Sequence, residues 1–327
     1  MKACLGIDTS NYRTSTALCA LKSGAKDSVF YEEKRLLTVE LGQRGLQQSQ
    51  ALFQHVTRLP ELVEKLMRAH PECEIAAVCV STQPRPVEGS YMPVFRAGES
   101  AARSIAAALK TPCFFTSHQE GHLAAARVGT GLNADKPYLA LHLSGGTTEV
   151  LAVSEGRYEL LGGSADLHAG QLIDRIGVKL GLHFPAGPEL EKLAMQGRAQ
   201  ARLSASLHGL ECHFSGAETK ALGWIETGEV TREEIAAETF DCVARTVARL
   251  VLAGCEKSGA TQALLAGGVA SSALLRGEIT ERVRKRNGRI RLHFARPELS
   301  GDNAVGVALI GAAKYREQGG SADGEAD

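Results

Sequence analysis

Two histidines stand four residues apart in the segment SHQEGH, residues 117–122. If this segment is helical, His118 and His122 lie one turn apart on the same face, at about the spacing that one metal ion needs from two imidazoles. An exposed pair of histidines on a helix surface would show the same spacing. The pattern therefore leaves two hypotheses open: His118 and His122 are two ligands of a metal site, or they are an exposed pair on a helix.

The residues between the histidines argue against a zinc peptidase. In the HExxH motif of metalloproteases the glutamate directly follows the first histidine, whereas here Gln119 takes that place and Glu120 comes next. One residue corresponds to about 100° around a helix, so Glu120 cannot occupy the same position over a metal ion. Gly121 in mid-helix costs about 1 kcal/mol relative to alanine. A close neighbour, such as the opposite lobe or a ligand, would explain why a glycine stands at this position.

Three glycine- or hydroxyl-rich turns each follow an apolar strand: DTSNYRTS (8–15), LSGGTTEV (143–150) and LLAGGVASS (264–272). Glycine lets a phosphate approach the backbone, and a helix that starts after such a turn presents free N–H groups to an anion. Each turn alone is typical of an ordinary tight turn. In this order and spacing they resemble the actin, Hsp70 and sugar-kinase superfamily, in which the first two hairpins hold phosphates and the third turn lies against adenosine.

The hydrophobic patterns predict an α/β protein of two lobes, with duplicated mixed sheets flanked by helices. The N-terminal lobe (1–133) would carry the first phosphate hairpin and the histidine-pair helix. The C-terminal lobe (134–318) would carry the second hairpin and the adenosine turn, and the tail (319–327) is expected to be disordered. Pro60 should break or kink a helix expected over 49–68.

Composition restricts the function only weakly. Lysine plus arginine equals aspartate plus glutamate at 37 each, so any nucleic-acid surface must be local, and RVRKRNGRIR (282–291) is the densest basic run. A solvated helix end explains that run equally well. Eight cysteines without a CxxC pair are typical of reduced, buried thiols. No signal peptide or membrane span is apparent, so we expect a cytoplasmic protein without a membrane partner.

Several longer motifs carry a more specific resemblance. They are HxEGH, the SGG after a strand, LIDRIGVKLGLHFPAGP (172–188), HFSGAETK (213–220), AGGVASSALLR (266–276) and FARPELSGDN (294–303). Together they resemble the universal tRNA threonylcarbamoyladenosine transferase family, whose members were once described as O-sialoglycoprotein endopeptidases. The similarity is collinear from residue 4 to about residue 315, which is nearly the whole chain.

The resemblance implies a set of site residues. His118, His122 and Asp302 would ligate one divalent metal ion, iron or zinc, although Asp302 alone could equally be a helix N-cap. Asp8 and Glu120 are the candidate catalytic carboxylates, and Glu120 could instead hydrogen-bond a ligating histidine. The adenylate site would be lined by His142, Leu143, Ser144, Gly145, Gly146, Asp174, Gly187, Gly267, Gly268 and Ser272. Without the resemblance, Asp174 could be an ordinary exposed carboxylate on a helix.

The implied reaction moves a threonylcarbamoyl group from threonylcarbamoyl-adenylate to the exocyclic amine of a tRNA adenosine beside the anticodon. This is acyl transfer with AMP as leaving group, so the phosphate must be bound and the carbonyl polarised. Amides of residues 144–146 would hold the phosphate, and the metal would hold the phosphate-carbonyl end. The implied partners are tRNA, the adenylate-forming enzyme and accessory subunits of a modification complex.

The chain also departs from the family pattern. The family's first turn commonly reads ETSCDET, so Tyr12 and Arg13 replace an acidic pair here. Thr147 replaces a histidine in SGGHT, and Ser272 replaces an asparagine of the third turn. These changes leave two alternatives open, a paralogue with a different carbamoyl acceptor and a non-catalytic nucleotide-binding partner subunit. A simple kinase has no reason to keep the histidine pair.

Overall fold

The computed structural model describes residues 1–10, 12–22, 30–38, 46–200 and 202–319, and divides the chain into two compact units. The first unit consists of residues 1–131 and 301–327, and the second of residues 132–300. The expected disordered tail lies, from residue 320 on, outside the described residues. None of the described helices combines the length and apolarity needed to cross a bilayer.

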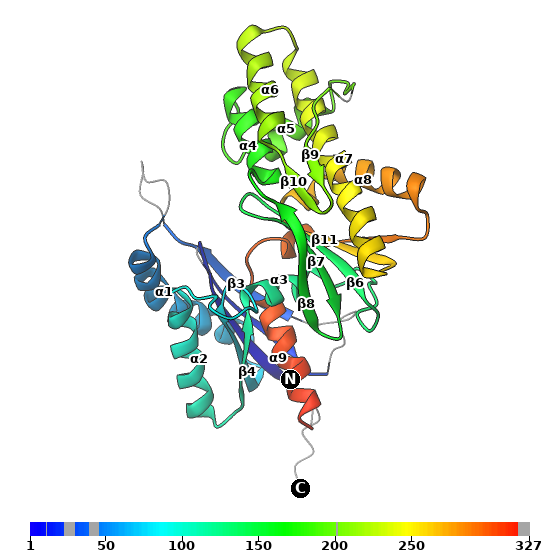
Figure 1. Ribbon diagram of the computed structural model, residues 1–327. Coiled ribbons are helices and arrows are strands. Elements are labelled where there is room, and N and C mark those ends of the chain that lie inside the picture. Colours follow the sequence, from blue (N-terminus) through cyan, green and yellow to red (C-terminus); the bar gives the residue numbers. More distant parts are fainter. Residues whose placement is uncertain (11, 23–29, 39–45, 201, 320–327) are drawn as a thin grey trace. The chain divides into compact units, whose positions relative to one another are not determined.

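The first unit is a five-stranded sheet with the order β3-β2-β1-β4-β5 (Figure 1). Its strands are β1 (Lys2–Thr9), β2 (Arg13–Ala20), β3 (Phe30–Leu36), β4 (Glu74–Gln83) and β5 (Cys113–Ser117). Its helices are α1 (Gln48–Ala69), α2 (Phe95–Leu109), α3 (His118–Ala126) and α9 (Val305–Glu317). The first three strands pair antiparallel, whereas β1, β4 and β5 pair parallel.

Alternation along β1 explains how both faces of this sheet are covered. Ala3, Leu5 and Ile7 pack in one cluster with side chains of α1 and α2. On the opposite face, a Cβ atom at Gly6 would lie 2.5 Å from the backbone nitrogen of Ala308, so α9 contacts the strand directly. Because Gly6 has no side chain, the backbone of α9 can pack directly against β1.

The position of α9 changes the expected domain boundaries. The sequence placed residues up to 318 in the C-terminal lobe, but residues from Gly301 on belong to the first unit because α9 packs on its sheet. Asp302 is therefore a residue of the first unit. Pro60 does not interrupt α1, which is continuous from Gln48 to Ala69.

The second unit is a seven-stranded sheet with the order β12-β11-β6-β7-β8-β10-β9. Its strands are β6 (Tyr138–Leu143), β7 (Thr148–Ser154), β8 (Arg157–Ser164), β9 (Ser206–His208), β10 (Glu211–His213), β11 (Gln262–Ala266) and β12 (Arg291–Phe294). Its helices are α4 (Ala169–Lys179), α5 (Gly187–Ala194), α6 (Ser215–Thr227), α7 (Arg232–Ser258) and α8 (Ala273–Arg286), with short 3₁₀ turns η1 (Val269–Ser271) and η2 (Pro297–Leu299). The long helix α7 is buried along much of its length.

The two sheets share one internal order. In the first, a hairpin β1–β2 continues antiparallel into β3 on one side and parallel into β4 and β5 on the other. In the second, β6–β7 continues into β8 on one side and into β11 and β12 on the other, with the same directions. This repetition confirms the predicted α/β fold with duplicated mixed sheets.

Candidate functional site

Three side chains that could ligate a metal ion meet in the first unit. Nε2 of His122 lies 3.0 Å from Nε2 of His118 and 3.1 Å from Oδ1 of Asp302. Nε2 of His118 lies 3.6 Å from the same oxygen. Two atoms that bind one zinc or iron ion at about 2.1 Å each can be no more than about 4.2 Å apart. All three separations fit that limit, so this donor set suits a single ion.

The packing of α3 against α9 brings these ligands together (Figure 1). A Cβ atom at Gly121 would lie 2.9 Å from Cγ2 of Val307 in α9. The close neighbour that the mid-helix glycine required is therefore a helix of the same unit. Asp302 is not the cap of that helix, because Oδ1 of Asn303 accepts from the amides of Val305 and Gly306 instead. The carboxylate of Asp302 is thus available to interact with His118 and His122.

The carboxylate of Asp8 orients the first histidine. It is fully buried, and its Oδ1 lies 2.9 Å from Nδ1 of His118 and accepts from Oγ of Ser81 at 2.5 Å. A hydrogen bond at Nδ1 directs Nε2 toward the other ligands, as supporting carboxylates do in metal sites. Asp8 therefore lies where it can position His118, and the catalytic role expected from the sequence stays a prediction.

Two residues of the first turn hold the aspartate ligand. Oγ of Ser10 donates to Oδ2 of Asp302 at 3.0 Å, and the guanidinium of Arg13 donates to its backbone carbonyl at 2.9 Å. Arg13 occupies a position where the family pattern is acidic. This change from the family pattern thus lies beside the three candidate ligands, where Arg13 helps to fix the backbone of Asp302.

The electrostatics of the cluster follow from its two carboxylates. Burial alone would lower the pKa of His118, but Asp8 and Asp302 raise it to about 10. Burial would raise the pKa of Asp302, yet hydrogen bonds from His118 and His122 hold it well below its ordinary value. The cluster is an anionic environment that favours a positive charge, whether a proton or a metal ion.

The carboxylate of Glu120 caps the N-terminus of α3. Its Oε2 accepts from the amide and hydroxyl of Ser117 at 2.7 Å each and from Oγ1 of Thr116 at 3.0 Å. Oγ of Ser117 in turn accepts from the amide of Glu120, which completes a capping box at the start of α3. This carboxylate therefore stabilises the N-terminus of α3, and the catalytic role expected from the sequence stays a prediction.

The second unit contains a pocket of about 390 Å³ that gathers three motifs far apart in the sequence. Predicted residues that line it are Gly145, Asp174, Gly187, Gly268 and Ser272. Ile173, Glu191, Phe240 and Val269 line it too and were not predicted. Phe240 gave no sequence signal, because it lies within the buried run of α7, where an apolar residue is expected in any case. Ile173 and Val269 lie within motifs that were recognised, next to Asp174 and Gly268.

The polar groups of this pocket are few. Oδ1 of Asp174 accepts from the amide of Ala186 at 2.8 Å, and burial raises the pKa of Asp174 although amides of Ala186 and Gly187 oppose that shift. Oγ of Ser272 accepts from the amide of Leu275 and caps α8. The pocket thus combines apolar side chains with two partly buried carboxylates, Asp174 and Glu191, and with glycines that leave space for a ligand.

The remaining residues of the predicted adenylate set do not line the pocket. The amide of Ser144 donates to the carbonyl of Thr147 at 2.8 Å and closes the hairpin turn, so it is not free for a phosphate. The amide of Gly146 points to Oγ of Ser144 at 3.3 Å. Gly267 packs against the backbone at the start of this turn. Its φ is 97°, and a Cβ atom there would lie 2.3 Å from the carbonyl oxygen of Leu143. His142, the last of the set, lies on β6, where it pairs with Ala266 of β11.

The basic run is partly neutralised by neighbouring carboxylates. Arg282 pairs with Asp241 at 2.6 Å and with Glu278 at 2.9 Å. Arg284 and Lys285 both pair with Glu281. The rest of the run is Arg286, Arg289 and Arg291, all exposed. Both alternatives, a nucleic-acid surface and a solvated helix end, are compatible with these exposed arginines.

Solved structures with the same architecture identify the fold class. A HypF crystal structure in the phosphate- and nucleotide-bound form has a TM-score of 0.60 and 13% identity, covering 98% of this chain and 47% of its own. HypF of T. kodakarensis gives 0.62 and 14%, covering 97% and 48%. A ROK family glucokinase from Streptomyces griseus, in complex with glucose and AMPPNP, gives 0.53 and 11%, covering 95% and 99%. The chain thus has a sugar-kinase-like fold, and it spans about half the length of the HypF chains.

The family follows from the sequence. The model of the TsaD family, tRNA N6-adenosine threonylcarbamoyltransferase, matches residues 38–309, which is most of the chain. The protein therefore belongs to the tRNA N6-adenosine threonylcarbamoyltransferase family, as the motifs indicated. By its description, that family consists of carbamoyl-type transferases that act on a tRNA adenosine.

Proposed function

We propose that this protein transfers a threonylcarbamoyl group from threonylcarbamoyl-adenylate to the exocyclic amine of a tRNA adenosine next to the anticodon. The amine nitrogen attacks the carbamoyl carbon and forms the new C–N bond. The bond from that carbon to the phosphate oxygen breaks, AMP leaves with the electron pair, and the amine loses one proton. The observation that carries the proposal is the pocket formed by three family motifs that are distant in the sequence.

The pocket suits the adenylate moiety. Ile173, Phe240 and Val269 provide an apolar lining for a purine, and the missing side chains of Gly145 and Gly268 leave space beside it. The half-buried Asp174 carboxylate is the group we assign to a ribose hydroxyl. Its pKa is raised by burial, so an accepted hydrogen bond from a hydroxyl would stabilise its charged form.

In the first unit, His118, His122 and Asp302 would hold one divalent ion, iron or zinc. When bound, such an ion supplies Lewis-acid polarisation of a phosphoryl or carbonyl oxygen. The chain's own contribution is to preorganise the donors. Asp8 fixes the ring of His118, and Ser10 with Arg13 fixes Asp302.

The partners remain part of the proposal. The reaction needs tRNA, an enzyme that makes the adenylate and accessory subunits of a modification complex, and it would take place in the cytoplasm. A second candidate keeps the adenylate chemistry with another acceptor amine. It is favoured by Arg13, a cation beside the ligand cluster where the family pattern is acidic.

Genetic rescue tests the proposal. The chain is expressed in cells depleted of their own transferase, and threonylcarbamoyladenosine in digested tRNA is measured by mass spectrometry. We expect the modified nucleoside to be restored by the natural sequence and lost in the His118→Ala/His122→Ala variant. A folded, metal-loaded protein that restores none of the nucleoside would contradict the tRNA role and select the candidate with a different acceptor.

A further inference from the structure

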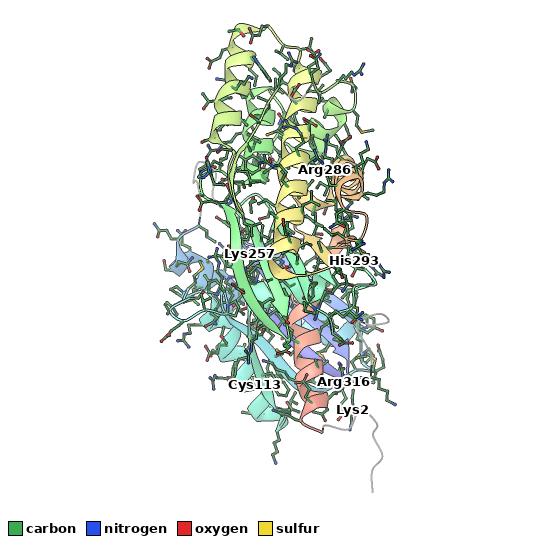
Figure 2. The ribbon with its side chains drawn as sticks, turned by 45° about the vertical axis from the view of Figure 1, so that its right-hand side comes forward. Lys2, Cys113, Lys257, Arg286, His293 and Arg316 are labelled. Carbon is green, nitrogen blue, oxygen red and sulfur yellow. The ribbon has the colours of Figure 1, made fainter. Side chains whose placement is uncertain are left out.

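A second hollow in the second unit is lined mainly by arginine and lysine side chains. It has a volume of about 500 Å³, lies between α7 and α8, and is lined by Arg245, Ala248, Arg249, Leu252, Arg282, Lys285 and Arg286. No carboxylate is among these lining residues. Figure 2 shows Arg286 on α8, which packs against the long helix α7. This basic hollow, defined by these seven residues, draws on two helices, whereas the sequence run 282–291 lies on one helix and the turn after it.

The carboxylates nearby position some of these cations and leave others available. Asp241 accepts from Arg245 at 2.7 Å and from Arg282 at 2.6 Å, so one buried carboxylate fixes two guanidinium groups. Arg249 and Arg286 are exposed, and neither forms an ion pair or side-chain hydrogen bond within the part of the chain that the structure describes. The hollow thus combines anchored guanidinium groups with two free ones, and keeps a positive excess.

The basic hollow and the 390 Å³ pocket that we assign to the adenylate (the nucleotide pocket) both border α7. A smaller hollow of about 290 Å³ shares Phe240 with the nucleotide pocket and Arg282 with the basic hollow. Arg245 and Arg249 follow Phe240 by five and nine residues, which is about 8 and 14 Å along a helix axis. A few nucleotides of a polynucleotide chain span such a distance.

We propose that the basic hollow binds the phosphate backbone of the tRNA whose adenosine is modified. This deepens the proposed function and rests on it. Guanidinium groups match phosphate oxygens with two parallel hydrogen bonds, and arginines held by a buried carboxylate lose little freedom on binding. Arg249 and Arg286 are the residues we expect to contact phosphate most strongly. Such contacts give affinity and register without reading the base sequence.

The test measures binding of a fluorescently labelled, unmodified tRNA transcript to the full-length protein by anisotropy over a series of salt concentrations. In the Arg249→Gln/Arg286→Gln variant we expect affinity to fall several-fold. The slope of log affinity against log salt should become shallower by roughly 1.5, because each lost phosphate contact removes about 0.7 to 0.9. The matched control is Lys136→Gln/Arg157→Gln, which removes two exposed cations of the same unit and should bind like the natural sequence.

Each outcome decides the proposal. Unchanged affinity and slope in Arg249→Gln/Arg286→Gln, or no tRNA binding by the natural sequence, would overturn it. If the variant loses binding to poly-glutamate but keeps binding to tRNA, the hollow takes an acidic protein segment instead. Stabilisation by AMP should be the same in the variant and the natural sequence, so a failure of the nucleotide site is distinguished from a failure of the RNA surface.

Discussion

Gly306 in α9 lies so close to α3 that a Cβ atom added to it would fall 1.8 Å from the carbonyl oxygen of Gly121. No side chain can be placed at that distance without separating the two helices. Because α3 carries both histidines and Asp302 lies just before α9, the crossing of these helices sets the distances among His118, His122 and Asp302. Two glycines that contact no ligand thereby determine whether the ligands converge.

Replacing Gly306 by alanine should therefore damage the cluster as well as the fold. We expect Gly306→Ala to lower the free energy of unfolding by about 2 kcal/mol or more and to reduce the bound metal. Chemical denaturation and elemental analysis measure the two effects. Gly277→Ala is the matched control, since Gly277 lies exposed within α8 with free space around its Cβ position, and should gain about 0.5 to 1 kcal/mol. Equal stability of both variants would refute the tight crossing.

Metal content tests the ligand assignment directly. We expect one divalent ion per purified chain and its loss in His118→Ala/His122→Ala, because the remaining aspartate offers a single donor. Elemental analysis by mass spectrometry measures the ratio of metal to protein. The control removes two other histidines, His183→Ala/His208→Ala, and should keep the metal. Retention of the ion by the cluster variant would show that it binds elsewhere.

Filling the pocket that we assign to the adenylate should abolish the stabilisation of the protein by AMP. Gly268 has a right-handed helical backbone (φ −58°, ψ −36°) and free space around its Cβ position, so Gly268→Val is expected to fold normally while occupying the pocket. AMP should raise the melting temperature of the natural protein, since a ligand at about 100 times its dissociation constant stabilises by about 2.7 kcal/mol.

Gly216→Val is the control for that substitution, since Gly216 is an exposed position at the start of α6 with free space around it. This control should retain the full shift with AMP. An equal shift in the Gly268→Val protein would mean that AMP binds at another place.

His55 predicts a specific dependence of stability on pH. It is buried between the carbonyl of Ser10 and Oγ1 of Thr14, and burial lowers its pKa to about 4. The unfolded chain takes up the proton near 6.5, so the stability that His55 contributes is complete above that pH and is lost as pH falls from 6.5 to about 4. Between pH 7.5 and 5 this loss amounts to about 2 kcal/mol.

Urea denaturation in the presence of a chelator isolates this effect from metal binding. The His55→Gln variant should lack about 2 kcal/mol of the decrease between pH 7.5 and 5, because glutamine does not titrate. His208→Gln, which changes an exposed histidine, should show the same decrease as the natural sequence. If His55→Gln and the natural sequence lose stability equally, His55 is not held neutral by the fold.

The sequence predicted that His118, His122 and Asp302 would come together, and it did so from a local spacing and a family motif. The spacing of His118 and His122 depends only on the helix, and Asp302 came from a family motif. The position of α9 could not be predicted, because an apolar helix at the end of a chain fits either sheet. The contact of Asp8 with His118 was also missed, since it requires the register of β1 against β4 and β5.

The 390 Å³ pocket of the second unit was likewise predicted only in part. Gly145, Asp174 and Gly268 belong to turns or helices with recognisable patterns, and these residues line the pocket. The amide of Ser144 was expected to bind phosphate, but a backbone N–H in a tight turn often finds its partner within the turn. Sequence patterns locate such turns, but they do not show which amides remain free.

Glu120 distinguishes a structural carboxylate from a catalytic one. Because glutamine also completes a capping box, Glu120→Gln should preserve α3, the bound metal and transfer activity within about two-fold. A carboxylate that acts as an acid or base would instead cost about 100-fold or more when replaced by an amide. Ser117→Ala removes the reciprocal bond of the same cap and should cost about 1 kcal/mol of stability. A large loss of activity in Glu120→Gln, with unchanged metal content and stability, would show that this carboxylate takes part in the reaction.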